Sequence, residues 1–144
     1  MGREDEVRDL FDDHYDHVVR TAFLIVQDWG RAEEIAQDAF VQLLRYWGRV
    51  SGHEMPAAWV RRVAVRLAVR SVRRERRLTT AMVRSMPSPV VTDPAEAAAS
   101  ADVLAALGKL PAKQRAAAVL FYFEDRPVEE IADLLDCSTS TAGV

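Results

Sequence analysis

The chain has 144 residues, of which 49% are hydrophobic, and its formal net charge is −3. This length suits one domain or two small helical ones. A lone cysteine, Cys137, excludes an internal disulfide framework and fits a reducing compartment. No apolar run approaches the roughly 20 residues of a membrane span, and the acidic first ten residues do not fit a secretory signal. We therefore expect a cytoplasmic, mainly helical protein.

Charge is divided unevenly along the chain. Residues 1–54 carry twelve acidic and six basic side chains, residues 55–77 carry one acidic and eight basic, and residues 78–144 carry nine acidic and five basic. A basic segment inside an acidic chain indicates a polyanionic partner for that segment, whatever the net charge of the whole.

Residues 3–27 are predicted to form a first helix, because apolar residues recur there at helical spacing. Asp13 and His17 are four residues apart, a spacing that metal sites use, but no further His or Cys cluster completes a coordination shell. We therefore expect a solvated acidic face and no metal. The predicted buried residues are Val7, Leu10, Phe11, Tyr15, Val18, Ala22, Ile25 and Val26.

A second helix is predicted from the N-cap Asp28 to about Trp47. Its polar face is acidic and surrounds an exposed Val41, which could be a docking surface for a basic partner or an ordinary solvated face. The residues alone favour the solvated face. The apolar half consists of Ala32, Ile35, Ala36, Ala39, Phe40, Leu43, Leu44 and Trp47.

Residues 48–55 are predicted to form a short loop, and Pro56 suits the first position of a third helix that runs to residue 77. This helix carries an arginine stripe, whose members lie within about 80° of one another at 100° per residue. The stripe consists of Arg62, Arg66, Arg70, Arg73 and Arg77, spaced four, four, three and four apart. Because only Glu75 is interleaved, local salt bridges do not explain it. Nucleic acid is the first partner to consider, and a solvated basic face is the alternative.

The opposite side of the same helix carries Val60, Val63, Ala64, Leu67 and Ala68, which we expect to be buried. Trp59 lies near the stripe by the same angular count. It could stack on a nucleobase, but packing over a neighbouring helix end is favoured.

Residues 78–94 break all periodicity and contain three prolines, which indicates a linker and a domain boundary. Three short helices follow, opened by Pro94, Pro111 and Pro127. A tight turn at Asp136 and an N-cap at Ser138 then predict a helix-turn-helix, with a plain helical hairpin as the alternative. Only six residues remain after Ser138, fewer than the roughly ten that a recognition helix needs. We therefore expect the C-terminus to be cut short.

Several motifs resemble the bacterial RNA polymerase sigma factors, and within them the extracytoplasmic-function group. Residues 32–40 (AEEIAQDAF) are similar to the signature of sigma region two. Residues 58–64 (AWVRRVA), with their arginine-rich continuation, resemble the promoter-melting helix. Residues 110–115 (LPAKQR), 122–125 (YFED) and 130–138 (EIADLLDCS) resemble the helix-turn-helix of region four, although Asp136 stands where a glycine is usual. Asp tolerates the left-handed conformation that the turn needs.

The resemblance implies an all-α protein with two small domains joined by a flexible linker. Region two would span residues 1–77, the linker 78–94 and an incomplete region four 95–144. Core RNA polymerase would be held, through the coiled coil of its largest subunit, by Glu34, Gln37, Asp38 and Val41. Promoter DNA would be held by His53, Arg62, Arg66, Arg70, Arg73, Arg74 and Arg77 at the minus-ten element, and by Ser138, Thr139, Ser140 and Thr141 at the minus-thirty-five element.

The function implied is promoter recognition and melting, with no cofactor and an anti-sigma factor as a further expected partner. A free-standing helix-turn-helix regulator is the alternative. It would not need the acidic face at Glu34, Gln37 and Asp38. An enzyme is not expected, because the sequence has no Gly-rich phosphate loop, no Cys/His metal spacing and no nucleophile–base pair.

Overall fold

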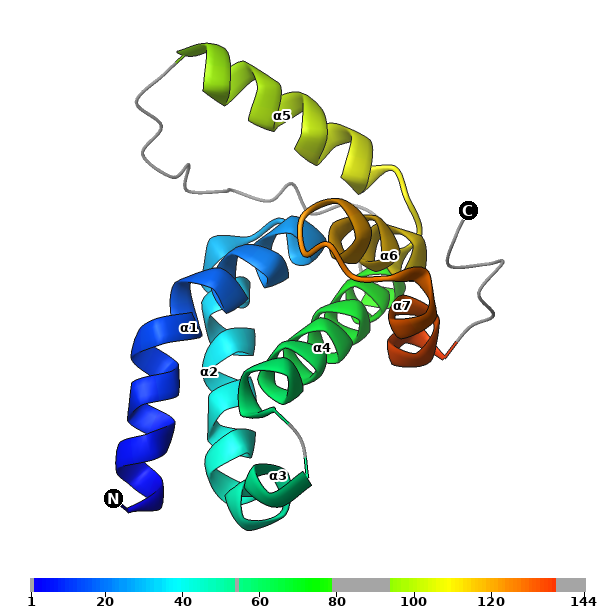
Figure 1. Cartoon of the computed structure of the whole chain (residues 1–144). Helices are drawn as coiled ribbons and strands as arrows, with labels where there is room; N and C mark the ends of the chain where they lie inside the picture. Colours follow the sequence, from blue (N-terminus) through cyan, green and yellow to red (C-terminus); the bar gives the residue numbers. More distant parts are fainter. Residues whose placement is uncertain (1, 54, 79–93, 137–144) are drawn as a thin grey trace.

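The computed structural model describes residues 2–53, 55–78 and 94–136, without the side chains of residues 53, 76–78 and 94–100. Over these ranges the chain is helical and contains no strand, as the all-α prediction required (Figure 1). The helices are α1 (Arg3–Val26), α2 (Trp29–Arg45), α3 (Trp47–His53), α4 (Pro56–Leu78), α5 (Pro94–Gly108), α6 (Ala112–Tyr122) and α7 (Val128–Leu135). No helix in the described part is long and apolar enough to cross a membrane.

The boundary between α1 and α2 is set by local chemistry. Gln27 ends α1 in the left-handed conformation, with φ 59° and its backbone N–H bonded to the carbonyl of Phe23. The Asp28 side chain then accepts a hydrogen bond from the backbone N–H of Arg31 at 3.1 Å. This bond satisfies one of the unpaired amides at the start of α2, so the predicted N-cap is confirmed.

The loop predicted for residues 48–55 is wrong, because residues Trp47–His53 form α3. The backbone N–H groups of Arg49 and Val50 both donate to the carbonyl of Tyr46 at 3.0 Å. Val50 is buried, so its packing stabilises this short helix against the cost of its two glycines.

Helices α1, α2 and α4 form the first half of the molecule and bury the apolar faces that their periodicity predicted. The α2 face is fully confirmed, since every residue of its predicted half is buried or packed against the core. In α4 the buried arc is wider than expected on one side, because Val65, Val69 and Val72 are buried in addition to Val60, Ala64 and Ala68. Val63 and Leu67, which were also expected to be buried, are only partly buried against the core. The wider arc shows that α4 is covered from more than one side.

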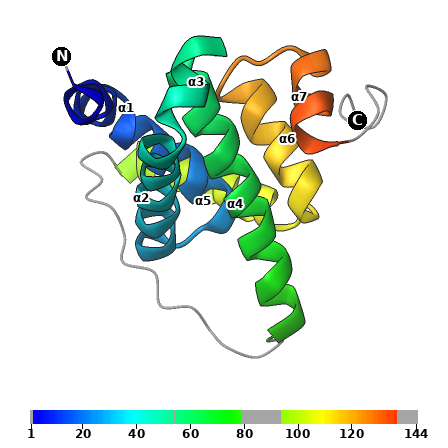
Figure 2. The same ribbon diagram turned by 90° about the horizontal axis from the view of Figure 1, so that it is seen from below.

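Helices α5, α6 and α7 form the second half of the molecule, and α6 and α7 supply the second cover of α4. Helix α4 lies between α1 and α2 on one side and α6 and α7 on the other, as two perpendicular views agree (Figures 1 and 2). Helix α6 also contacts α1, and α5 packs against α1 and α6. A single hydrophobic core therefore runs through both halves. The linker was expected at residues 78–94, of which 79–93 lie outside the described residues, while Leu78 ends α4 and Pro94 begins α5. The division at residue 77 stays a prediction.

Candidate polymerase and nucleic-acid interfaces

The predicted arginine stripe, together with Arg74, lies on the side of α4 that the core does not cover, and we call this side the arginine face. Arg66, Arg70, Arg73 and Arg74 are exposed, and Arg62 is half-buried. The backbone of α4 continues past Arg77, although that side chain lies outside the described residues. Because α4 is one uninterrupted helix, it holds these guanidinium groups in a row along a rigid rod.

A groove of about 570 Å³ runs beside this row, between α4 and the second half of the molecule. Its basic wall carries four of the α4 arginines, and Lys113 of α6 adds a fifth cation. Val69, Leu134 and Leu135 contribute apolar surface, and Asp136 lies at the α7 end. The groove therefore combines high positive charge with hydrophobic walls.

Helix α7 contacts the start of the arginine face directly. The Nη2 atom of Arg62 lies 3.4 Å from Oδ2 of Asp133. The Nε atom of Arg66 donates to the backbone carbonyl of Leu134, also at 3.4 Å. Both arginines were predicted to be DNA contacts, and the structure places each against α7.

The acidic face of α2 lies on the surface, as predicted. Glu34, Gln37 and Asp38 are exposed, and Val41 is 54% exposed although it is a large apolar residue. The amide Nε2 of Gln37 donates to the hydroxyl of Tyr15 at 3.4 Å. The exposure required for a docking surface is therefore present on this face.

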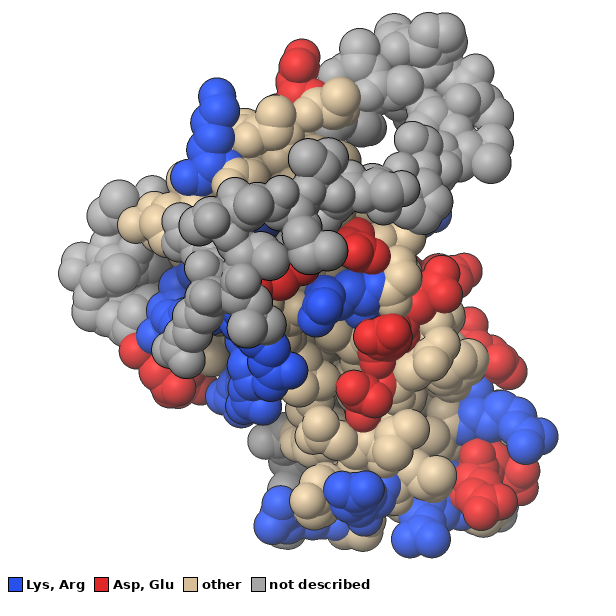
Figure 3. Space-filling model, turned by 180° about the vertical axis from the view of Figure 1, so that it is seen from behind, with Lys and Arg blue, Asp and Glu red and all other residues tan. Residues whose placement is uncertain are grey.

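The acidic and basic faces adjoin, which periodicity within each helix could not show. Glu34 and Asp38 of α2 line one groove together with Arg70 and Arg74 of α4. Figure 3 shows the back of the molecule, where a cluster of basic side chains lies beside a line of acidic ones. A hydrogen bond of 2.8 Å from Nη1 of Arg31 to Oγ of Ser71 fastens α2 to α4 beneath this groove.

Trp59 packs within the protein, as the sequence favoured. It is half-buried against the core, and its ring meets Tyr46 edge-on with centroids 6.4 Å apart. His53 is the last residue of α3, and α4 begins at Pro56, but the side chain of His53 lies outside the described residues. The same holds for Ser138, Thr139, Ser140 and Thr141, so the structure does not describe the recognition segment.

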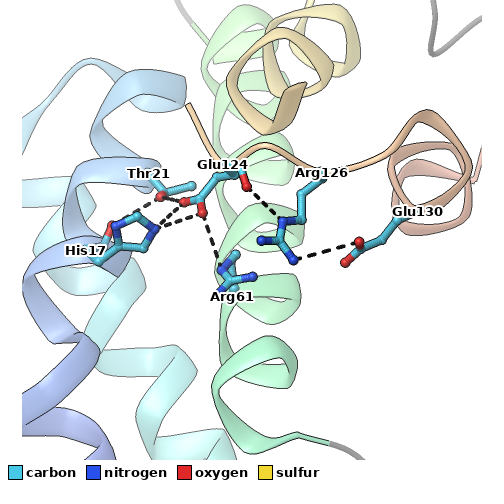
Figure 4. A network of polar contacts seen from close by, with 6 residues as sticks. All are labelled: His17, Thr21, Arg61, Glu124, Arg126 and Glu130. Carbon is cyan, nitrogen blue, oxygen red and sulfur yellow. Dashed lines mark hydrogen bonds and ion pairs between the residues drawn. The ribbon is translucent and has the colours of Figure 1, made fainter. Parts of the chain in front are cut away.

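A polar cluster around the buried Glu124 joins the two halves, and the sequence did not indicate it (Figure 4). Glu124 follows α6 and is 7% exposed. Its carboxylate accepts hydrogen bonds from Nε2 of His17, at 2.7 and 2.8 Å from the two oxygens, and from the hydroxyl of Thr21. The buried Nε of Arg61 lies 3.5 Å away, within ion-pair distance but not aligned for a hydrogen bond. His17 lies on the solvated face that was expected for α1, with its side chain 51% exposed, but it also donates to Glu124, which the sequence did not indicate.

Further contacts fasten the second half beside this cluster. Arg115 of α6 donates from Nη1 to the carbonyl of Ile25 at 2.5 Å. Gln27 donates from Nε2 to the carbonyl of Leu104 at 2.7 Å.

The cluster around Glu124 was only weakly indicated by the sequence. Thr21 lies within the apolar spacing of α1, and Glu124 follows directly on an apolar run.

Two family descriptions match the chain. Sigma-70 region 2 matches residues 10–78, and Sigma-70, region 4 matches residues 100–144. Together they account for most of the sequence and fall on either side of residues 79–93. The chain therefore belongs to the sigma-70 family of transcription initiation factors, which confirms the resemblance read from its motifs. No curated protein matches the chain. Among the described residues, no three or more His, Cys, Asp or Glu side chains gather as a metal site would require.

Proposed function

We propose that this protein is a sigma factor of the extracytoplasmic-function group, which binds core RNA polymerase and directs promoter recognition and melting. One observation carries the proposal. The part of the chain that matches sigma region two presents an exposed acidic face and an exposed arginine face side by side on a rigid helical unit.

The arginine face suits one strand of melted promoter DNA. Single-stranded DNA is a flexible line of phosphates, and a row of guanidinium groups on one helix can neutralise several of them. Base recognition at the minus-ten element would come from the end of α3 around His53, shortly before α4 begins at Pro56. Trp59 is half-buried and packs edge-on against Tyr46, so we assign it to packing and not to base stacking.

The α2 face suits the polymerase. Glu34 and Asp38 are acidic, exposed and one helical turn apart, and Gln37 and Val41 extend the same surface. A coiled coil with basic side chains would pair with the two carboxylates and cover Val41, which otherwise stays in water. Region four would add contacts to the minus-thirty-five element through residues 138–141, and an anti-sigma factor would be a further partner in the cytoplasm.

The experiment is a pull-down with core RNA polymerase. We expect Glu34→Arg with Asp38→Arg to abolish core binding while circular dichroism stays unchanged, because both side chains are exposed. Asp12→Arg with Asp16→Arg is the matched control, since it makes the same charge change at the same spacing on the exposed side of α1. Undiminished core binding by the folded α2 variant would contradict the docking face. If the α1 control variant also lost core binding, the change in net charge would explain the loss, and the α2 face would not be a specific docking surface.

A further inference from the structure

We propose that this chain has a closed, self-blocking form, in which Glu124 latches the second half onto the first and α7 covers the start of the arginine face. The blocking consequence rests on the proposed function of that face in binding DNA. The latch itself does not, because it is a set of contacts between two halves of one chain.

Glu124 gives the latch its chemistry. Its carboxylate is almost fully buried, and a buried carboxylate is costly unless donors surround it. All three of its described partners, His17, Thr21 and Arg61, belong to the first half of the molecule. The carboxylate is therefore satisfied in only two situations, either with the halves together or in water with the halves apart. Such an arrangement favours two discrete states over a gradual loosening.

The neighbouring Arg126 does not share this role. Arg126 donates from Nε to the backbone carbonyl of Glu124 at 2.9 Å and pairs with Glu130 at 3.9 Å. These contacts lie within the second half, so they shape the turn between α6 and α7 and survive separation of the halves. Figure 4 shows the contrast: the Glu124 carboxylate points toward α1 and α4, whereas Arg126 points toward Glu130.

Helix α7 provides the blocking contacts. Asp133 places a carboxylate 3.4 Å from the guanidinium of Arg62, where a phosphate of bound DNA would otherwise lie. The carbonyl of Leu134 accepts from Arg66 in the same way. Asp136 and Leu135 then face the groove lined by Arg70, Arg73 and Arg74. A strand following the arginine face from Arg62 onward would meet α7, so closure removes two cations from DNA and narrows access to the others.

Blocking of Arg62 and Arg66 by α7 should lower the salt dependence and the affinity of DNA binding by an amount that can be estimated. Each phosphate neutralised on a single strand contributes about −0.7 to the slope of log K against log salt concentration. Release of both arginines from α7 should therefore steepen this slope by about 1.4. At 50 mM salt the same two contacts correspond to an affinity gain of up to about 60-fold. If the chain exchanges between a closed and an open form, its apparent affinity for DNA also scales with the fraction of chains that are open. Weakening the latch raises this fraction and therefore also raises the affinity.

The experiment uses the whole chain without polymerase and two independent readouts. Small-angle scattering reports the radius of gyration, which is about 14.5 Å for a compact chain of this length. Fluorescence anisotropy with a labelled single-stranded oligonucleotide, titrated at several salt concentrations, reports affinity and slope. The variants are Glu124→Gln, which removes the latch charge, and Asp133→Asn, which removes the ion pair between α7 and Arg62 at an exposed position. The matched controls are Glu130→Gln, whose carboxylate pairs within the second half, and Asp102→Asn on α5.

We expect Glu124→Gln to raise the radius of gyration and to steepen the slope by about 1.4, and Asp133→Asn to steepen it by about 0.7. Both controls should stay at the wild-type values. An unchanged radius in the folded Glu124→Gln chain would overturn the latch, and a larger radius with an unchanged slope would overturn the blocking role of α7. If Glu124→Gln does not fold, an unchanged slope in Asp133→Asn overturns the blocking role instead. Absence of strand binding by every variant would refute the proposed DNA function, while the radius would still decide the latch.

Discussion

Reversing the charge of Arg70 and Arg73 is the most direct test of the arginine face. Both side chains are exposed, and neither is among the residues that α7 contacts through hydrogen bonds or ion pairs in the described structure. The change to Glu therefore leaves the latch contacts in place and alters only the open part of the face. If both arginines contact phosphates, the double variant loses two favourable contacts and gains two repulsive ones.

The expected loss of DNA affinity can be estimated from the two phosphate contacts that the exposed arginines would lose. Two lost phosphate contacts reduce the salt slope by about 1.4 and the affinity at 50 mM salt by about 60-fold. Because each tenfold change in affinity corresponds to about 1.4 kcal/mol, this loss of affinity is about 2.5 kcal/mol of binding free energy. Each new carboxylate–phosphate pair adds about 1 kcal/mol of repulsion at 4 Å in water. We therefore expect a total loss of about 4–5 kcal/mol at low salt, most of it gone at high salt because exposed charges are screened.

Two assays measure this loss. Anisotropy titrations with a single-stranded oligonucleotide give the slope, and permanganate footprinting of the minus-ten region shows whether the variant holoenzyme opens a promoter. Arg8→Glu with Arg20→Glu is the control, because it makes the same charge change on the exposed side of α1. Core polymerase binding should be retained in both variants. Normal strand opening by a folded Arg70→Glu, Arg73→Glu holoenzyme would refute the assignment and leave the row as a solvated face.

Two further predictions concern stability and are measured by urea unfolding. Leu43→Ala should lower the free energy of unfolding by about 2–5 kcal/mol, because Leu43 is fully buried at the centre of the α2 face; a loss below 1 kcal/mol would contradict the packing. Asp28→Ala should cost about 1 kcal/mol through loss of the cap on the Arg31 amide, whereas Asp28→Asn should restore most of it. Equal stability of the Ala and Asn variants would show that the cap contributes nothing.

The adjoining faces of α2 and α4 bear on how these variants are interpreted. Arg70 and Arg74 share a groove with Glu34 and Asp38, so each face lies in the electrostatic field of the other. A charge change on one face will have a small effect on the partner of the other. This effect should vanish at high salt, where the Debye length falls well below the width of a helix. Measuring core binding and strand binding at two salt concentrations separates the direct effect from the indirect one.

The helices and their apolar faces could be predicted from the sequence, because their causes are local. A helical period in the apolar residues determines which side of α2 is buried, and the cap at Asp28 bonds to an amide only three residues away. Asp136 was expected to tolerate a left-handed conformation, and it does so at φ 54°. Helix α3 was missed because Gly48 and Gly52 indicate a loop locally, whereas the burial of Val50 is a property of the packed protein.

The exposed arginine and acidic faces were also predicted, since both are patterns along a single helix. That they adjoin, and that α7 covers part of one of them, depends on contacts between distant segments. Glu124 lies 107 residues from His17 and 103 from Thr21, and no periodic pattern links residues at such separations. The wider buried arc of α4 has the same origin, because Val65 and Val69 become core residues only when a second group of helices packs against them. The sequence by itself thus determined what each helix presents, and the tertiary structure decided what each surface meets, because burial of a charge or an apolar side chain depends on every segment that reaches it.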